Sequence, residues 1–119
     1  MLYVDDDQAL RRVLPRGLST WFDVVSVANA DAAVDAASGS VFDAALVDLE
    51  MPDASGWETI ERIGRVDARL ARRAIIFTGA QLDEQTLAWS RARGHDIVPK
   101  TTRAADLATA VLDRIRDVQ

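Results

Sequence analysis

Residues 44–56, AALVDLEMPDASG, decide the fold of this chain. The apolar run Ala44–Val47 predicts a buried strand that ends at Asp48. Pro52 and Gly56 then mark a loop, and an apolar spacing typical of one helix face follows them. This stretch is therefore predicted to be a strand, a loop that begins at an acidic residue, and a helix.

The same alternation of short apolar runs and helical patterns occurs about five times along the chain. Strands that are apolar on both faces, with helical connections between them, indicate a buried parallel sheet. We predict an α/β fold, doubly wound (βα)5, with a five-stranded parallel sheet. The predicted strands are Met1–Val4, Phe22–Val27, Ala44–Val47, Ala74–Phe77 and His95–Val98, and the helices lie near residues 10–18, 30–37, 57–66, 83–92 and 104–115.

Length and composition limit the possible functions. With 119 residues, the chain is expected to form one domain, 1–119, without an output domain. The absence of cysteine excludes disulfides and favours a cytoplasmic location. No apolar run approaches the ~20 residues that span a bilayer, and the start turns acidic at once, so we expect neither a membrane segment nor a signal peptide. The net charge of −5 disfavours binding to nucleic acid.

Polar side chains follow four of the five predicted strands. Asp5 and Asp6 follow the first strand, Asp48 the third, Thr78 the fourth and Lys100 the fifth. In an open parallel sheet the ligand site lies beyond the carboxyl ends of the strands, so these side chains are expected to converge. The lysine stands alone among thirteen arginines, which indicates that its position needs a compact ammonium rather than a flat guanidinium.

Three clustered carboxylates repel one another by ~4 kcal/mol per pair at 4 Å in an effective dielectric of 20. Either their pKa values rise or a cation lies among them. Oxygen-only ligands suit Mg²⁺, which binds carboxylates, waters and phosphate. A carboxylate such as Asp48 can attack phosphorus to give an acyl phosphate. Thr78 can donate its hydroxyl hydrogen to one phosphoryl oxygen, and Lys100 can pair with another.

Four segments together resemble the signatures of response-regulator receiver domains: Val4-Asp5-Asp6, residues 48–52 with Gly56, Phe77-Thr78-Gly79 and Val98-Pro99-Lys100. They cover the whole chain in the right order and spacing. The resemblance implies a flavodoxin-like fold with strand order 2-1-3-4-5. It also implies a two-component phosphorelay in which a histidine kinase or histidine phosphotransfer protein supplies the phosphoryl group, and an unknown downstream protein reads the result.

The resemblance also implies roles for individual residues. Asp6 and Asp48 bind Mg²⁺ through their side chains, Glu50 adds its backbone carbonyl, and Asp5 acts mainly through water. Such a domain catalyses only its own phosphorylation and dephosphorylation, so a turnover enzyme is not expected. The full implied set is Asp48 as phosphoacceptor, Thr78 as switch hydroxyl, Lys100 as phosphate-pairing cation, and Asp5, Asp6, Asp48 and Glu50 around the metal.

Two positions depart from the family pattern. The family usually has an aromatic residue three positions before the lysine, where this chain has Ile97. It also usually has a cis-joined proline after the lysine, where this chain has Thr101, and Pro99 precedes the lysine instead. A cis bond without proline would cost ~3–4 kcal/mol. We therefore predict intact phosphorylation chemistry, a different path for the following loop, and a smaller rearrangement of the last two strands than is usual.

Two other functions fit parts of the sequence. A pseudo-receiver that never carries phosphate, and only binds a protein, is favoured by Ile97 and Thr101 but not by the complete acidic set. A haloacid-dehalogenase-type phosphatase needs a second aspartate two residues after the nucleophile, where Glu50 stands here. The apolar faces of the last two helices suggest a partner or homodimer surface. We expect His95 and the Arg72-Arg73 pair at the surface, and Trp57 and Trp89 as packing residues.

Overall fold

The computed structural model describes residues 1–79 and 81–119. Within them, five parallel strands form one sheet in the order β2-β1-β3-β4-β5, which confirms the predicted α/β class and strand order. None of the described helices is long and apolar enough to cross a membrane. The strands are β1 Leu2–Val4, β2 Val25–Val27, β3 Ala45–Asp48, β4 Ala74–Thr78 and β5 Ile97–Pro99.

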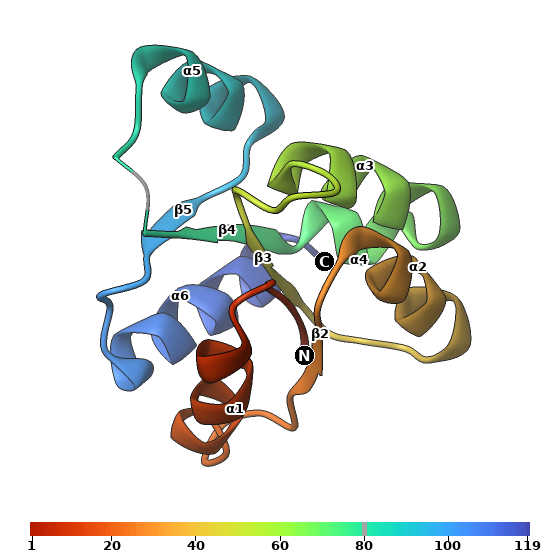
Figure 1. Ribbon diagram of the computed structural model, residues 1–119, viewed down its shortest axis with the longest axis vertical. Coiled ribbons are helices and arrows are strands. Elements are labelled where there is room, and N and C mark those ends of the chain that lie inside the picture. Colours follow the sequence, from red (N-terminus) through yellow and green to blue (C-terminus); the bar gives the residue numbers. More distant parts are fainter. Residues whose placement is uncertain (80) are drawn as a thin grey trace.

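Helices cover both faces of this sheet (Figure 1). Two helices, α1 and α6, pack on one face, while α2, α3 and α4 pack on the other. Helix α5 lies on the side of α3, where Trp89 of α5 contacts Trp57 of α3. The helices are α1 Gln8–Gly17, α2 Ala30–Gly39, α3 Gly56–Val66, α4 Ala68–Arg72, α5 Glu84–Arg93 and α6 Ala104–Asp117.

Alternation along the central strands creates two separate apolar cores. In β1, Leu2 and Val4 pack toward α2 and α3, whereas Tyr3 between them packs toward α1 and α6. In β3, Val47 joins the first core and Leu46 the second. Successive side chains of a strand point to opposite faces, so a strand covered by helices on both faces has to be apolar at every position. This explains the continuous apolar runs in the sequence.

Aspartate, asparagine and serine side chains begin five of the helices. Each accepts a hydrogen bond from a backbone N–H three residues ahead, which satisfies one of the free donors at a helix start. Asn29, for example, accepts from the Ala32 N–H at 2.8 Å. The same geometry at Asp67 starts α4, a short helix that the sequence analysis did not predict. The five capping residues are Asp7, Asn29, Ser55, Asp67 and Asp83.

Two strands begin two or three residues later than predicted because neighbouring turns use their backbone groups. Phe22, the predicted start of the second strand, donates its N–H to the Leu18 carbonyl at 2.9 Å, so pairing begins only at Val25. His95, the predicted start of the fifth strand, donates its N–H to the Ser90 carbonyl at 3.2 Å. That bond closes the end of α5 around Gly94, whose φ of 70° is in the left-handed region that favours glycine.

Two basic side chains that we expected at the surface are buried beside the start of β4. Arg73 is 3% exposed; its Nε donates to the Val118 carbonyl at 2.6 Å and its Nη1 donates to the Asp43 carbonyl at 3.2 Å. His95 Nδ1 donates to the Ala74 carbonyl at 2.8 Å. Both predictions were wrong because backbone carbonyls brought close by the fold accept these donors, and a sequence pattern does not reveal such partners.

The first residue of α3 is packed tightly against the end of β3. Gly56 donates its N–H to the Leu49 carbonyl at 2.8 Å. A Cβ atom on Gly56 would lie 2.7 Å from the Asp48 carbonyl oxygen and 2.9 Å from Ile76 Cδ1. Only glycine permits this approach of two backbone segments, which brings the start of α3 against the Asp48 backbone.

We predict that Gly56→Ala lowers the free energy of unfolding by about 1–3 kcal/mol, because the methyl group overlaps backbone that cannot yield easily. Gly39→Ala is the matched control, since a Cβ at Gly39 meets nothing within 4 Å. It should leave stability unchanged or raise it by about 0.4–1 kcal/mol. Urea denaturation followed by circular dichroism measures both variants. Equal stability of the two would contradict the packing argument.

Candidate functional site

The sheet brings the carboxyl ends of four strands to one edge. Asp48 is the last residue of β3 and Thr78 the last of β4, while Asp5 follows β1 and Lys100 follows β5. Strand register aligns these ends, because Asp48 pairs with Phe77 and Thr78 pairs with Pro99. The Lys100 N–H also donates to the Thr78 carbonyl at 2.9 Å. The predicted convergence of polar groups at this edge is therefore present in the fold.

Three carboxylates and one ammonium meet there. One oxygen each from Asp5, Asp6 and Asp48 lies within 4.8 Å of the other two. Asp5 is 0% and Asp48 5% exposed, whereas Asp6 faces solvent. Lys100 Nζ lies 2.9 Å from Asp5 Oδ2 and 3.4 Å from Asp48 Oδ2. The ammonium thus bridges the two buried carboxylates.

A pocket of about 340 Å³ opens beside this cluster. The hydroxyl-bearing Thr78 is nearly buried in its wall. Glu50 lies at the rim with an exposed side chain, and its backbone N–H donates to Asp48 Oδ1 at 3.4 Å. The space therefore has carboxylate, hydroxyl and ammonium groups around it. Its lining residues are Asp48, Glu50, Thr78, Gly79 and Lys100.

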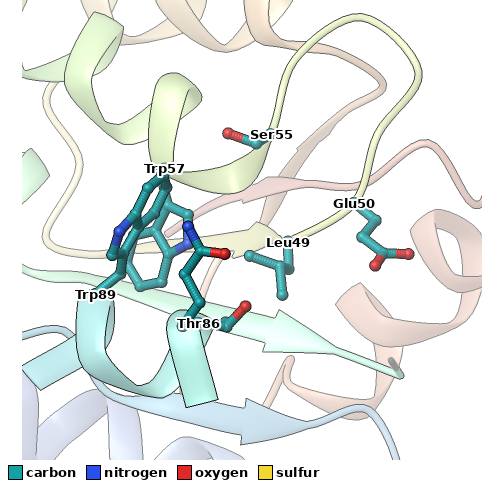
Figure 2. A pocket seen from close by; sticks show the side chains of 7 residues that line it. Leu49, Glu50, Ser55, Trp57, Thr86 and Trp89 are labelled. Carbon is teal, nitrogen blue, oxygen red and sulfur yellow. The ribbon is translucent and has the colours of Figure 1, made fainter. Parts of the chain in front are cut away.

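A second groove of about 260 Å³ adjoins the first, since Glu50 lines both (Figure 2). Trp57 and Trp89 meet edge to face at its far end, with ring centroids 6.3 Å apart. The Arg93 guanidinium lies 4.8 Å from the Trp89 ring centroid. Trp57 is buried, as predicted for a packing residue, whereas Trp89 is 41% exposed and packs only in part.

The two buried carboxyl groups differ in proton affinity. Burial, and next the charge on Asp5, raise the pKa of Asp48 to about 7. Burial also acts to raise the pKa of Asp5, but hydrogen bonds from Tyr3, the Asp7 backbone and Lys100 outweigh it, and the pKa of Asp5 is lowered. Burial acts to lower the pKa of Lys100, but the hydrogen bond to Asp5 and the charges on Asp5 and Asp48 together outweigh burial, and the pKa is raised. Lys100 therefore stays charged beside an ionised Asp5.

Tyr3 was not among the predicted site residues, yet it contacts one of them. This side chain is fully buried, and its hydroxyl donates to Asp5 Oδ2. Two features of the sequence pointed to the contact. Residues 3 and 5 lie two apart in an extended segment and so point to the same face, and a buried tyrosine hydroxyl usually has a hydrogen-bond partner.

The donor set fits a hard divalent cation. All the clustered groups bind through oxygen, the donor that Mg²⁺ prefers. Three ionised carboxylates and one ammonium leave a formal charge of −2 at the cluster, which a divalent ion neutralises. The raised pKa of Asp48 indicates that, without such an ion, this carboxylate lacks sufficient compensation for burial and repulsion.

The family model of the response regulator receiver domain matches residues 1–112. The chain belongs to this family. Receiver domains are signalling modules rather than turnover enzymes, and they interact with phosphodonor kinases and downstream effectors. No curated protein matches the chain.

Solved receiver domains share the fold of this chain at low sequence identity. It is similar to a CheY-like receiver domain protein from Methanospirillum hungatei JF-1, with a TM-score of 0.84 and 24% identity over 98% of this chain and 92% of that one. It is also similar to the signal receiver domain of a putative Luxo repressor protein from Vibrio parahaemolyticus, with a TM-score of 0.83 and 22% identity over 98% and 89% of the two chains.

The positions that depart from the receiver pattern lie at and just after β5. Ile97 opens β5, pairs with Ile76 of β4, and packs partly buried against the core on the α2 and α3 side. Thr101 is exposed, and the Thr102 N–H donates to the Pro99 carbonyl at 3.0 Å. All peptide bonds of the described residues are trans. This receiver domain thus has an aliphatic residue at the position where the family usually has an aromatic one.

We predict that Asp48→Asn stabilises the metal-free protein more at pH 8 than at pH 5. The native pKa of Asp48 is about 7 against an ordinary 3.8, so native Asp48 keeps a proton that the unfolded chain has lost between these values. The contribution of Asp48 to the free energy of unfolding of wild type is therefore largest below pH 3.8, and it decreases as the pH rises from 3.8 to about 7.

The variant should exceed wild type by about 1–3 kcal/mol at pH 8, with a smaller difference at pH 5. Asp5, whose pKa is lowered from its ordinary 3.8, stays ionised from pH 5 to pH 8, and the shifted pKa of His95 affects both proteins alike. Urea denaturation in the presence of a chelator, at a series of pH values, gives this difference. A constant difference between the two proteins across the series would refute the assignment.

Proposed function

We propose that residues 1–119 form a phosphoacceptor receiver domain of a cytoplasmic two-component phosphorelay. A phosphohistidine on a histidine kinase or histidine phosphotransfer protein donates its phosphoryl group to Asp48, and the product switches a protein–protein interaction. The observation that carries this proposal is the Lys100 ammonium, 3.4 Å from Asp48 Oδ2, beside a pocket that Thr78 also lines. These are the acceptor, the cation and the hydroxyl that a phosphoryl group requires.

The transfer forms one bond and breaks another. A carboxylate oxygen of Asp48 attacks phosphorus, the bond from phosphorus to the histidine nitrogen breaks, and its electron pair returns to the imidazole. Thr78 donates its hydroxyl hydrogen to one phosphoryl oxygen, and Lys100 pairs with another. Lys100 already contacts Asp48, so it needs only a short movement to reach a group attached there.

Asp6, Asp48 and the Glu50 carbonyl are the proposed direct ligands of Mg²⁺. The ion, when bound, neutralises phosphoryl oxygens and keeps the acceptor ionised. Asp5 has little capacity left for direct coordination, since its two oxygens already accept hydrogen bonds from Tyr3, Lys100 and the Asp7 backbone. This supports a role for Asp5 through water.

The proposed output is a changed protein surface. Ile97 replaces the usual aromatic side chain, so we expect the last two strands to rearrange less than is usual in the family. Trp89 of α5 and Leu112 of α6 are large apolar residues, 41% and 47% exposed, and they support a proposed surface for a downstream partner or a second copy. A pseudo-receiver that only binds protein is the alternative, and Ile97 and Thr101 are what favour it.

Incubation with a small acyl phosphate and Mg²⁺, followed by intact mass spectrometry, tests the acceptor. Wild type is expected to gain the mass of one phosphoryl group and Asp48→Asn none, because the carboxamide is not a nucleophile for phosphorus. Asp53→Asn is the matched control: this residue lies in the same loop, and its side chain accepts from the Ala30 N–H at 3.2 Å, so it should gain the group normally. Equal gain by Asp48→Asn would rule out Asp48 as the acceptor.

A Mg²⁺ titration followed by tryptophan fluorescence separates the receiver from the pseudo-receiver. Trp57 lines the groove that shares Glu50 with the Asp48 pocket, so millimolar Mg²⁺ is expected to change its emission. Asp6→Asn should weaken this response, whereas Asp35→Asn, an exposed change on α2, should not. The absence of any response in wild type, together with no gain of phosphoryl mass, would favour the pseudo-receiver.

A further inference from the structure

Tyr3 is the chain's single tyrosine, and it is 0% exposed in the middle of the sheet. It lies in β1 between Ser26 of β2 and Leu46 of β3. Its ring meets Phe77 of β4 edge to face, with centroids 6.2 Å apart and planes at 72°. Strands on both sides and an aromatic neighbour thus fix the direction of the Tyr3 hydroxyl.

That hydroxyl and the Lys100 ammonium share one oxygen. Tyr3 Oη donates to Asp5 Oδ2, and Lys100 Nζ lies 2.9 Å from the same atom. The Asp7 N–H donates to the other oxygen, Oδ1, at 3.0 Å. Three donors, two from residues near Asp5 along the chain and one from the end of β5, therefore set both the position and the rotation of the Asp5 carboxylate.

We propose that Tyr3 is a positioning residue for Lys100, and that it acts through Asp5. The tyrosine hydroxyl fixes the carboxylate, and the carboxylate holds the ammonium at the mouth of the pocket, 3.4 Å from Asp48 Oδ2. We refer to Tyr3, Asp5 and Lys100 as the Tyr3 relay. The relay deepens the proposed function and rests on it, because only that function gives Lys100 a role in phosphoryl transfer. The contacts themselves can be tested without phosphoryl transfer.

A packing role alone does not require the hydroxyl. A phenylalanine would fill the same space in the core that contains Leu46 and Phe77. The hydroxyl adds a fixed donor that comes from the central sheet rather than from a loop. Lys100 follows an edge strand and has a long flexible side chain, so an anchor supported by rigid elements determines where its charge lies.

Selective isotope labelling tests the relay directly, because the chain has one tyrosine and one lysine. With ¹⁵N-lysine, Lys100 gives the single ammonium signal, and a hydrogen-bonded ammonium exchanges its protons slowly. Tyr3→Phe is expected to shift this signal and speed its exchange in metal-free protein. Thr59→Val is the matched control: it removes another buried hydroxyl, which donates to the Ser55 carbonyl at 2.8 Å, and should leave Lys100 unchanged.

The same variants are then compared in phosphorylation by a small acyl phosphate with Mg²⁺. Tyr3→Phe should slow the gain of phosphoryl mass on the order of tenfold, the equivalent of losing ~1.4 kcal/mol of orientation by hydrogen bonding. Thr59→Val should react at the wild-type rate. An unchanged Lys100 signal together with an unchanged rate in Tyr3→Phe would overturn the relay.

Failure of the proposed function, or of Tyr3→Phe to fold, can be distinguished from failure of the Tyr3 relay. If wild type gains no phosphoryl group, the proposed function is wrong, and the ammonium signal alone then decides whether Tyr3 positions Lys100. If Tyr3→Phe does not fold, the wild-type tyrosine hydroxyl proton decides: protection from exchange and a nuclear Overhauser contact to the Lys100 ammonium support the relay. A hydroxyl proton that exchanges as fast as that of free tyrosine overturns it.

Discussion

The buried contact of one ammonium with two carboxylates is the constraint on which this site depends. Two carboxyl groups under 6% exposed, Asp5 and Asp48, end neighbouring strands, and Lys100 lies within 3.4 Å of an oxygen on each. Removing the Lys100 ammonium would leave two buried carboxylates without their counter-charge and cost about 3–5 kcal/mol. The parallel sheet places the carboxyl ends of β1 and β3 side by side, and this brings the two carboxylates close together. The same sheet brings the end of β5, and with it the Lys100 ammonium, to that edge.

The backbone around β3 is adapted to hold this arrangement. Glycine at position 56 lets α3 start against the Asp48 carbonyl, and the Leu49 carbonyl accepts the Gly56 N–H. On the other side of the site, the Lys100 N–H donates to the Thr78 carbonyl. This bond joins the end of β5 to the end of β4 and places the Lys100 backbone beside the pocket. Short backbone contacts thus hold the strand ends that carry Asp48, Thr78 and Lys100.

The sequence was sufficient for the order of elements and for the edge at which Asp5, Asp48, Thr78 and Lys100 meet, since apolar runs and strand-end chemistry are local signals. It was insufficient wherever a backbone group finds its partner far along the chain. Arg73 was misplaced because its acceptors are the carbonyls of Asp43 and Val118. His95 was misplaced because its ring nitrogen Nδ1 donates to the Ala74 carbonyl, and α4 was missed because five residues leave hardly any periodicity.

Under the proposed function, phosphorylation of Asp48 changes which negative charge the Lys100 ammonium neutralises. The Asp48 carboxylate becomes the carbonyl group of a mixed anhydride, and the negative charge moves outward onto the phosphoryl oxygens, so the ammonium exchanges its Asp48 contact for a phosphoryl contact. Its contact with Asp5 need not break, because that oxygen is held from within the sheet by Tyr3. The Asp5 carboxylate then keeps its position while the Lys100 ammonium moves. Because the Asp5 carboxylate stays in place, only Thr78 and Lys100 need to move when Asp48 is phosphorylated. Such a local response does not require an aromatic side chain at position 97, where this chain has Ile97 in the strand next to β4.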